Sequence, residues 1–208
     1  YVSPTFSSRE FFGTGSIVPV KTLVPNRSLQ RMWEDWKRRN RLGGQVALAG
    51  HYGEAFNLKH RKELEAHPEY LALVKGKRQW SATAKWNISN KDFRELFIAD
   101  RVEELKKKLK QAKYSNEIIT ISVEPADSYG DCECEYCKRL GTVSDRDFFL
   151  ANEVAKAVAK ISPYAYVNLY AYSTHAAPPN FKLEPNVIVQ IIPYAFQKIG
   201  TPEQMITG

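Results

Sequence analysis

Cysteine is scarce in this chain of 208 residues and is confined to one short segment. The three cysteines are Cys132, Cys134 and Cys137, which excludes the framework of several disulfides found in small secreted domains. No apolar run approaches the length that crosses a membrane, and the first residues lack the basic and apolar regions of a signal peptide. Tyr1 is not a usual first residue, which leaves room for a leader segment ahead of it.

A glycine-rich phosphate loop is also missing after every predicted strand, so we expect no nucleotide and no other cofactor. The net charge is +7, but the positive side chains gather in segments 36–41 and 106–110. Both segments lie on predicted helices, where solvated basic faces are common, so nucleic acid is not an expected partner. With 43% hydrophobic and 25% charged residues, the composition is that of an ordinary globular domain. We therefore predict a single domain over residues 1–208.

Segment 117–139 begins as a predicted strand and ends as a polar loop. Pro125 ends the strand because it has no N–H to donate, and Asp127, Asp131 and the cysteines follow. Apolar and polar side chains alternate before it, with Ile119, Ile121 and Val123 on one face and Thr120, Ser122 and Glu124 on the other. A strand that ends in carboxylates and continues into a long loop is typical of an active site. The alternative is a solvated acidic loop.

Strands and helices alternate along the rest of the chain. Further strands are predicted at 9–12, 45–49, 166–172 and 187–192. Helices are predicted to begin at the capping residues Ser28, Asn57, Asn90, Ser144 and Thr201. The segment at about 52–90 is too long for a plain connection, and we expect an ordered insertion with a short helix and a hairpin near 71–76. Alternation of this kind is typical of a parallel sheet.

Small or polar residues occupy one face of four successive predicted strands. The rows are Ala47, Ala49 and His51; Thr120, Ser122 and Glu124; Asn168, Tyr170 and Tyr172; and Gln190, Ile192 and Tyr194. Strands of an open doubly wound sheet are apolar on both faces, whereas polar rows that lead to a mouth are typical of a barrel. We therefore predict an α/β fold of the (β/α)8 TIM-barrel type, incomplete, with about its first five units present. The alternative is an open doubly wound parallel sheet.

Several segments resemble the domain-of-unknown-function family 4838, which is associated with glycoside hydrolase family 163. They are 67–78, 122–137 with its Cys-x-Cys-x-x-Cys motif, 168–175, the pair Pro178-Pro179, and 186–189. The resemblance implies a TIM-barrel hydrolase with endo-β-N-acetylglucosaminidase activity on N-glycans. It also implies a glycan or glycoprotein as partner, a secreted, periplasmic or cell-surface location, and a barrel that continues past Gly208.

Glu124 and Asp127 are the candidate catalytic residues. Glycoside cleavage requires a protonated carboxyl at the leaving oxygen, and the acetamido carbonyl of the sugar can serve as the nucleophile in a retaining, substrate-assisted route. Strand parity turns Glu124 inward, where burial favours the neutral acid. Asp127 matches the loop aspartate of the family and is expected to hold the acetamido N–H or a sugar hydroxyl. The alternatives are a buried carboxylate paired with a base for Glu124 and a turn residue for Asp127.

Six further residues near strand ends are candidates for binding sugar hydroxyls or stacking on a sugar face: His51, Asn168, Tyr172, His175, Gln190 and Tyr194. Structural histidines and simple packing of tyrosines at the mouth are the alternatives. A second function compatible with these residues is that of a carbohydrate-binding barrel without catalysis. No membrane span is expected.

The cysteines have the close spacing of a metal site, but a structural zinc ion needs four ligands and the sequence shows no fourth one nearby. We therefore expect a structural thiol cluster or a disulfide clasp, with no metal. A metal-dependent module is the alternative. A nucleophilic cysteine is disfavoured because no histidine is adjacent in the sequence.

Overall fold

A computed structural model describes residues 8–9, 39, 43–44 and 50–192. The chain divides into two compact units, Tyr1–Ala47 and Leu48–Gly208. In the first unit, strand β1 (Ser8–Arg9) pairs antiparallel with β2 (Gly43–Gly44). The predicted strand 45–49, the helices expected after Ser28 and Thr201, and the candidate Tyr194 lie outside the described residues. The single domain over 1–208 stays a prediction.

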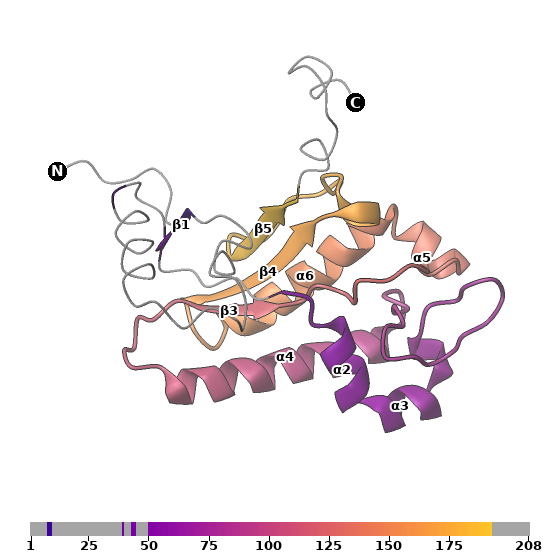
Figure 1. Cartoon of the computed structure of the whole chain (residues 1–208), viewed down its shortest axis with the longest axis horizontal. Coiled ribbons are helices and arrows are strands. Elements are labelled where there is room, and N and C mark those ends of the chain that lie inside the picture. The colour runs from indigo at the N-terminus through magenta and orange to yellow at the C-terminus, as the bar shows by residue number, and fades with distance from the viewer. Residues whose placement is uncertain (1–7, 10–38, 40–42, 45–49, 193–208) are drawn as a thin grey trace, which may run out of the picture. The chain divides into compact units, whose positions relative to one another are not determined.

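The second unit is built around a parallel sheet of three strands (Figure 1). The strands are β3 (Ile119–Ser122), β4 (Ala165–Ala171) and β5 (Val187–Ile191), in the order β3-β4-β5. Ile121 lies opposite Val167, and Tyr170 lies opposite Gln190. The mixed α/β class and the parallel sheet are confirmed. Three strands do not close into a barrel.

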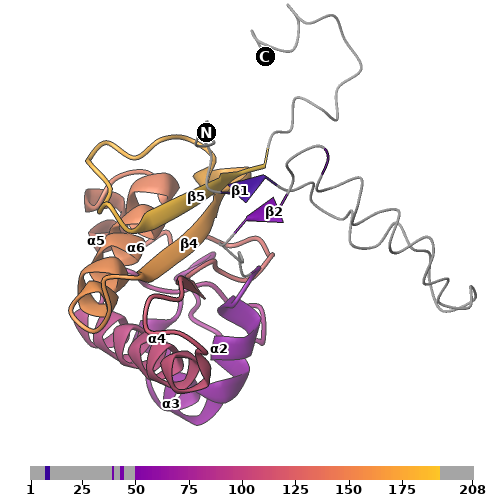
Figure 2. The same cartoon turned by 90° about the vertical axis from the view of Figure 1, so that its left-hand side faces the viewer.

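Two long helices cover the apolar face of this sheet, α4 (Lys91–Gln111) and α6 (Val143–Ala159). The core between them and the strands is fully buried: Phe93, Phe97, Leu105, Val154, Ile121, Val167 and Leu169 are all 0% exposed. Figures 1 and 2 show both helices on the same side of the strands. The polar row of β3 faces the other way and is also buried, since Thr120 and Ser122 are 5% and 4% exposed. Polar and apolar side chains therefore alternate along β3 as expected, but both sets are buried.

Helix starts were predicted with mixed success. Asn90 caps α4, because its side chain accepts a hydrogen bond from the N–H of Phe93, as expected. The cap of α6 is Thr142, so the predicted cap, Ser144, is wrong by two residues. Thr142 and Asp145 each accept from the other's backbone N–H, and this reciprocal pair satisfies two free donors at once.

The insertion near 52–90 is ordered, but its first helix does not start at Asn57. Helices α2 (Gly53–Lys59) and α3 (Arg61–Ala66) precede a short 3₁₀ helix, η2 (Pro68–Tyr70). Single antiparallel bridges join Leu71 to Trp86 and Val74 to Lys77, in place of a longer hairpin. Asn57 lies inside α2 rather than at its cap; its Nδ2 donates instead to the carbonyl groups of Ala82 and Ala84. Trp86 donates to Asn57 Oδ1 and packs in the aromatic core.

The connection from β4 to β5 is a loop with one 3₁₀ turn, η3 (Ser173–His175). Asn152 holds this loop against α6, since its Nδ2 donates to Lys182 O and its Oδ1 accepts from the N–H of Glu184. Asn186 donates to the carbonyl groups of Ala155 and Ala165. These amides link the loop to α6 and to the start of β4, while direct parallel pairing places β4 beside β3. In the described part of the chain, no helix is long and apolar enough to span a membrane.

Candidate functional site

The segment around His51 is fastened to the turn that follows β3. The N–H groups of Tyr52 and Gly53 both donate to Glu124 O, at 3.0 and 3.1 Å. Ser122 Oγ donates to Gly50 O at 2.6 Å. A Cβ atom on Gly53 would lie 2.1 Å from the N atom of Ala126, so only glycine fits this approach. His51 is thereby placed at the carboxyl end of β3.

Glu124 is fully buried and both of its carboxylate oxygens have partners. Oε2 accepts the N–H of Tyr170 at 2.7 Å, and Oε1 lies 2.9 Å from His175 Nε2. His51 Nδ1 lies 3.7 Å from Oε1 and 2.9 Å from Pro125 O. Glu124 is 0% exposed. This is the arrangement of a buried carboxylate paired with a base, which was the alternative interpretation of this residue.

His175 links Glu124 to a second carboxylate, that of Asp147 on α6. Asp147 Oδ2 lies 3.6 Å from His175 Nδ1, and neither atom has a hydrogen-bond partner among the described residues. Burial raises the pKa of Asp147 to about 6. For His175, burial lowers the pKa, but the hydrogen bond to Glu124 and the charge of Asp147 outweigh it, so the pKa of the imidazole is raised. The raised pKa values of His175 and Asp147 both favour the protonated forms of these two side chains in the folded state.

Aromatic rings form the open side of this group. The rings of His51 and Tyr170 meet edge to face with centroids 5.2 Å apart. Tyr172 lies 6.4 Å from His51 and 6.4 Å from His175, again measured between ring centroids. The side chain of His51 is 33% exposed. A ligand from solvent thus reaches His51 and Tyr172 before it reaches Glu124.

The structure therefore brings together four predicted residues, His51, Glu124, Tyr172 and His175. The other candidates are more scattered. Asn168 is buried on β4 opposite Ser122, and Gln190 is half-buried on β5 opposite Tyr170. Asp127 is exposed on the loop, and within the described ranges it forms no hydrogen bond or ion pair with the four.

A small pocket adjoins this group on the side of α6. Its lining includes Lys85, Pro125, Asp131, Arg146 and Asp147. Lys85 Nζ pairs with Asp131 Oδ1 at 2.8 Å, so one wall carries a fixed ion pair. Asp147 lines this pocket and also lies beside His175, so its carboxyl group contacts both.

A family model described as a domain of unknown function (DUF4838) matches residues 3–204. The chain belongs to this family. No curated protein and no solved structure matches this chain. Membership in DUF4838 therefore names no substrate and no reaction, and the chemistry has to be argued from the site.

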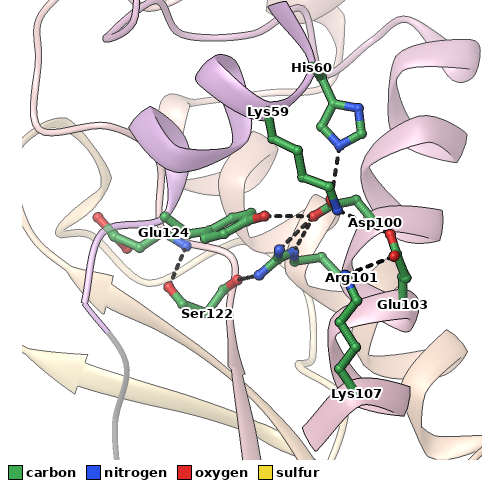
Figure 3. Close-up of polar contacts among 9 residues, drawn as sticks. Lys59, His60, Asp100, Arg101, Glu103, Lys107, Ser122 and Glu124 are labelled. Atoms are coloured by element: carbon green, nitrogen blue, oxygen red, sulfur yellow. Dashed lines mark hydrogen bonds and ion pairs between the residues drawn. The ribbon is translucent and has the colours of Figure 1, made fainter.

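Behind the site of this DUF4838 domain lies a buried polar network centred on Asp100 (Figure 3). Its Oδ1 pairs with Lys59 Nζ at 2.6 Å and His60 Nε2 at 2.8 Å. Its Oδ2 accepts from Tyr52 Oη and Arg101 Nε, each at 2.9 Å. Burial raises the pKa of Asp100, but the bonds from His60, Lys59 and Arg101 outweigh it and hold that pKa well below its usual range.

Arg101 carries this network to the sheet. Its Nη1 donates to Ser122 O at 3.3 Å, and its guanidinium stands over the ring of Tyr52, 3.1 Å from the centroid. Burial raises the pKa of Tyr52 to about 12. Because Tyr52 follows His51, the network holds the His51 segment in place from behind.

Sequence reasoning missed Asp147 and the Asp100 network. Asp147 follows Asp145, the partner of the cap Thr142, by two positions, and an Asp-x-Asp start to a helix beside a strand end is a usable signal. Asp100 and Arg101 are adjacent charged residues inside a helix, a pattern that usually lies in solvent. Only the packing of α2 and β3 against α4 shows that both are buried.

The three cysteines of the DUF4838 domain lie together, buried and as free thiols. Their sulfur atoms all fall within 4.8 Å of one another. A hydrogen bond from the Cys137 thiol, supported by the N–H of Leu73, lowers the pKa of Cys132, and the same pairing raises the pKa of Cys137. Of the two structural arrangements expected, the thiol cluster is present rather than the disulfide.

Proposed function

We propose that this DUF4838 domain belongs to a glycoside hydrolase that acts on glycans containing N-acetylglucosamine. The observation that carries the proposal is the meeting of His51, Glu124, Tyr172 and His175 at the carboxyl ends of two parallel strands. Ends of this kind are where parallel α/β folds place their ligands. We further propose that β3, β4 and β5 are part of a (β/α)8 barrel with its mouth at this edge.

The open side of the group suits a sugar. Tyr172 and His51 offer ring faces and hydrogen-bonding atoms at the edge that solvent reaches. Asp127 stands exposed on the following loop and can accept the N–H of a 2-acetamido group. In the proposed reaction the acetamido carbonyl attacks C1, the bond from C1 to the leaving oxygen breaks, and water later opens the cyclic intermediate with retention.

The leaving oxygen needs a proton, and two carboxyl groups compete for this role. Glu124 is 0% exposed and has both oxygens occupied, so it is better placed to orient His175 and His51 than to reach a glycan. Asp147 has a pKa raised to about 6 and lines the adjoining pocket. This pKa keeps the carboxyl group protonated up to about pH 6, well above the range of a free aspartate, as a general acid requires. We therefore propose Asp147 as the proton donor and Glu124 as the positioning residue.

A second candidate function is a glycan-binding barrel without catalysis. The burial of Glu124 favours it, because the carboxylate nearest the cluster of aromatic rings makes no contact with solvent. Both candidates place the protein where glycoproteins are found, so we propose a secreted, periplasmic or cell-surface location.

The decisive experiment compares binding with turnover. The full polypeptide that carries this domain is incubated with an N-glycosylated protein, and released glycan is measured by mass spectrometry. Calorimetry with N,N′-diacetylchitobiose measures binding. Release that Asp147→Asn abolishes, with binding kept, supports the hydrolase. Binding without release in the unaltered protein supports the binding barrel. Absence of both rejects both candidates.

Asp145→Asn is the matched control for the Asp147 variant. Asp145 lies two positions away on the same helix, but its carboxylate serves the helix cap and Asn180 rather than the pocket. Asp145→Asn should lower stability and leave turnover per folded molecule unchanged. Equal loss of turnover in both variants would show that helix position, and not the Asp147 carboxyl, is responsible.

A further inference from the structure

The three cysteines are buried close together, in the arrangement that a bound metal ion requires. Cys132, Cys134 and Cys137 come from the loop after β3 and from the short helix α5 (Glu135–Arg139). All three are at most 8% exposed, and their sulfur atoms fall within 4.8 Å of one another. In a tetrahedral zinc site with bonds to sulfur of about 2.3 Å, neighbouring sulfur atoms lie about 3.8 Å apart. The sulfur separations in the cluster exceed that spacing by no more than about 1 Å.

Backbone N–H groups already point at two of the sulfur atoms. The N–H of Leu73 donates to Cys132 Sγ at 3.3 Å, and the N–H of Cys137 donates to Cys134 Sγ at 3.4 Å. Hydrogen bonds of this kind stabilise a thiolate far more than a neutral thiol. Loss of all three thiol protons would leave buried negative charges, and unpaired buried charges are costly, so the deprotonated cluster requires a cation.

A fourth ligand atom comes from a distant part of the chain. Asn87 Oδ1 lies 3.1 Å from Cys137 Sγ and 3.6 Å from Cys134 Sγ. The orientation of this amide is set by its other end, since Asn87 Nδ2 donates to Glu69 O at 2.9 Å. Its oxygen therefore faces the sulfur atoms. Ser89 Oγ also donates to this oxygen, at 2.6 Å.

No further cysteine or histidine of this chain is free to complete the set. The sequence has three cysteines and four histidines. His51 and His175 lie at the site described above, His60 pairs with Asp100, and His67 pairs with Glu69. The donor set is therefore three sulfur atoms and one amide oxygen, and soft thiolate donors select zinc over magnesium or calcium.

We propose that Cys132, Cys134, Cys137 and the side-chain oxygen of Asn87 bind one Zn²⁺ ion with a structural role. Binding releases the three thiol protons, and the S–H groups that now face Asn87 Oδ1 give way to bonds to the ion. The ion joins the loop at 131–139 to the insertion at 69–89. That junction also carries the Lys85 and Asp131 pair on the pocket wall. The site does not depend on the proposed glycosidase activity.

Metal content is the first test. The chain is produced in medium with zinc chloride, dialysed against buffer, and analysed by inductively coupled plasma mass spectrometry. We expect close to one zinc ion per chain, released together with three reactive thiols when a thiol reagent is added. A folded chain with less than a tenth of an ion, or with two of the cysteines joined as a disulfide in mapped peptides, would overturn the site.

Cobalt substitution tests the ligands one by one. Co²⁺ in the unaltered chain should show an intense sulfur-to-cobalt charge-transfer band, which Cys137→Ser should weaken. Asn87→Ala should shift the weaker ligand-field bands and keep the charge-transfer band. Asn152→Ala is the matched control, because both asparagines are 7% exposed and hydrogen-bonded to backbone, yet Asn152 lies on α6 and contacts no cysteine. An Asn87→Ala spectrum identical to that of the control would overturn the ligand set.

Discussion

His175 Nε2 lies 2.9 Å from Glu124 Oε1 at a position where both side chains are at most 3% exposed. The two residues are 51 positions apart in the sequence and meet because β3 and β4 are neighbouring parallel strands. The pair therefore couples the ends of two strands, and it supports the ring of His51 as well as the turn at η3.

Removal of the Glu124 carboxylate should destabilise the fold strongly. Glu124→Ala leaves the N–H of Tyr170 and His175 Nε2 without their partner, and breaking a buried pair of this kind costs about 3–5 kcal/mol. Glu124→Gln keeps one acceptor and should cost about 1–3 kcal/mol. Urea unfolding measures both. Asp127→Asn, on the exposed loop, is the control and should stay within about 0.5 kcal/mol of the unaltered chain.

Stability should fall as pH rises from about 4 to 7, and Asp147 should cause part of this fall. Its pKa rises from 3.8 to about 6 on folding, so the folded state holds the proton more tightly. The resulting stabilisation is complete below pH 3.8 and is lost as pH passes about 6. Asp147→Asn should remove this part of the slope, up to about 3 kcal/mol.

His175 has a raised pKa, so its contribution is present below 6.5 and is lost as pH rises through its higher folded value. His175→Gln should flatten the curve in that upper range and, because the charge of His175 lowers the pKa of Asp147, should move the fall caused by Asp147 to higher pH. Thermal unfolding followed at several pH values distinguishes the two residues. A slope unchanged in both variants would contradict the proton arrangement described above.

Asn57→Ala should be among the most destabilising single changes in the insertion. It leaves the buried indole N–H of Trp86 and the part-buried carbonyl groups of Ala82 and Ala84 without partners. Each unsatisfied group costs about 1–3 kcal/mol, so a loss of at least about 3 kcal/mol is expected in chemical unfolding. Ser128→Ala removes a single exposed bond to Thr83 and serves as the control, with little change expected.

Gly53 and Gly76 should respond differently to alanine. At Gly53 a Cβ would lie 2.1 Å from a backbone nitrogen, and we expect Gly53→Ala to cost more than about 4 kcal/mol or to prevent folding. At Gly76 the Cβ meets nothing within 4 Å, and the strain comes only from a φ of +75°. About 1 kcal/mol is expected there. Similar losses at both positions would contradict the close packing of the His51 segment on the turn after β3.

Local pattern was sufficient to locate strands β3, β4 and β5 and several of the residues that gather at their ends. The alternation in 117–124, the apolar row of 166–172 and the cap at Asn90 each depend on neighbours within one turn or one strand. The candidates His51, Glu124, Tyr172 and His175 were found because strand ends can be located from periodicity, and parallel strands bring their carboxyl ends to one edge. The cap of α6 was misplaced because Thr142, Ser144 and Asp145 all have capping side chains, and their geometry decides among them.

The sequence by itself determined the α/β class, the positions of β3, β4 and β5, and the residue types that gather at their ends. Only the tertiary structure decided that Glu124 is buried against His175 and Tyr170, that Asp147 lies on the other side of His175, and that Asn87 faces the cysteines. The physical reason is that burial and hydrogen bonding are satisfied by partners far away along the chain, and sequence periodicity carries no information about which distant group arrives.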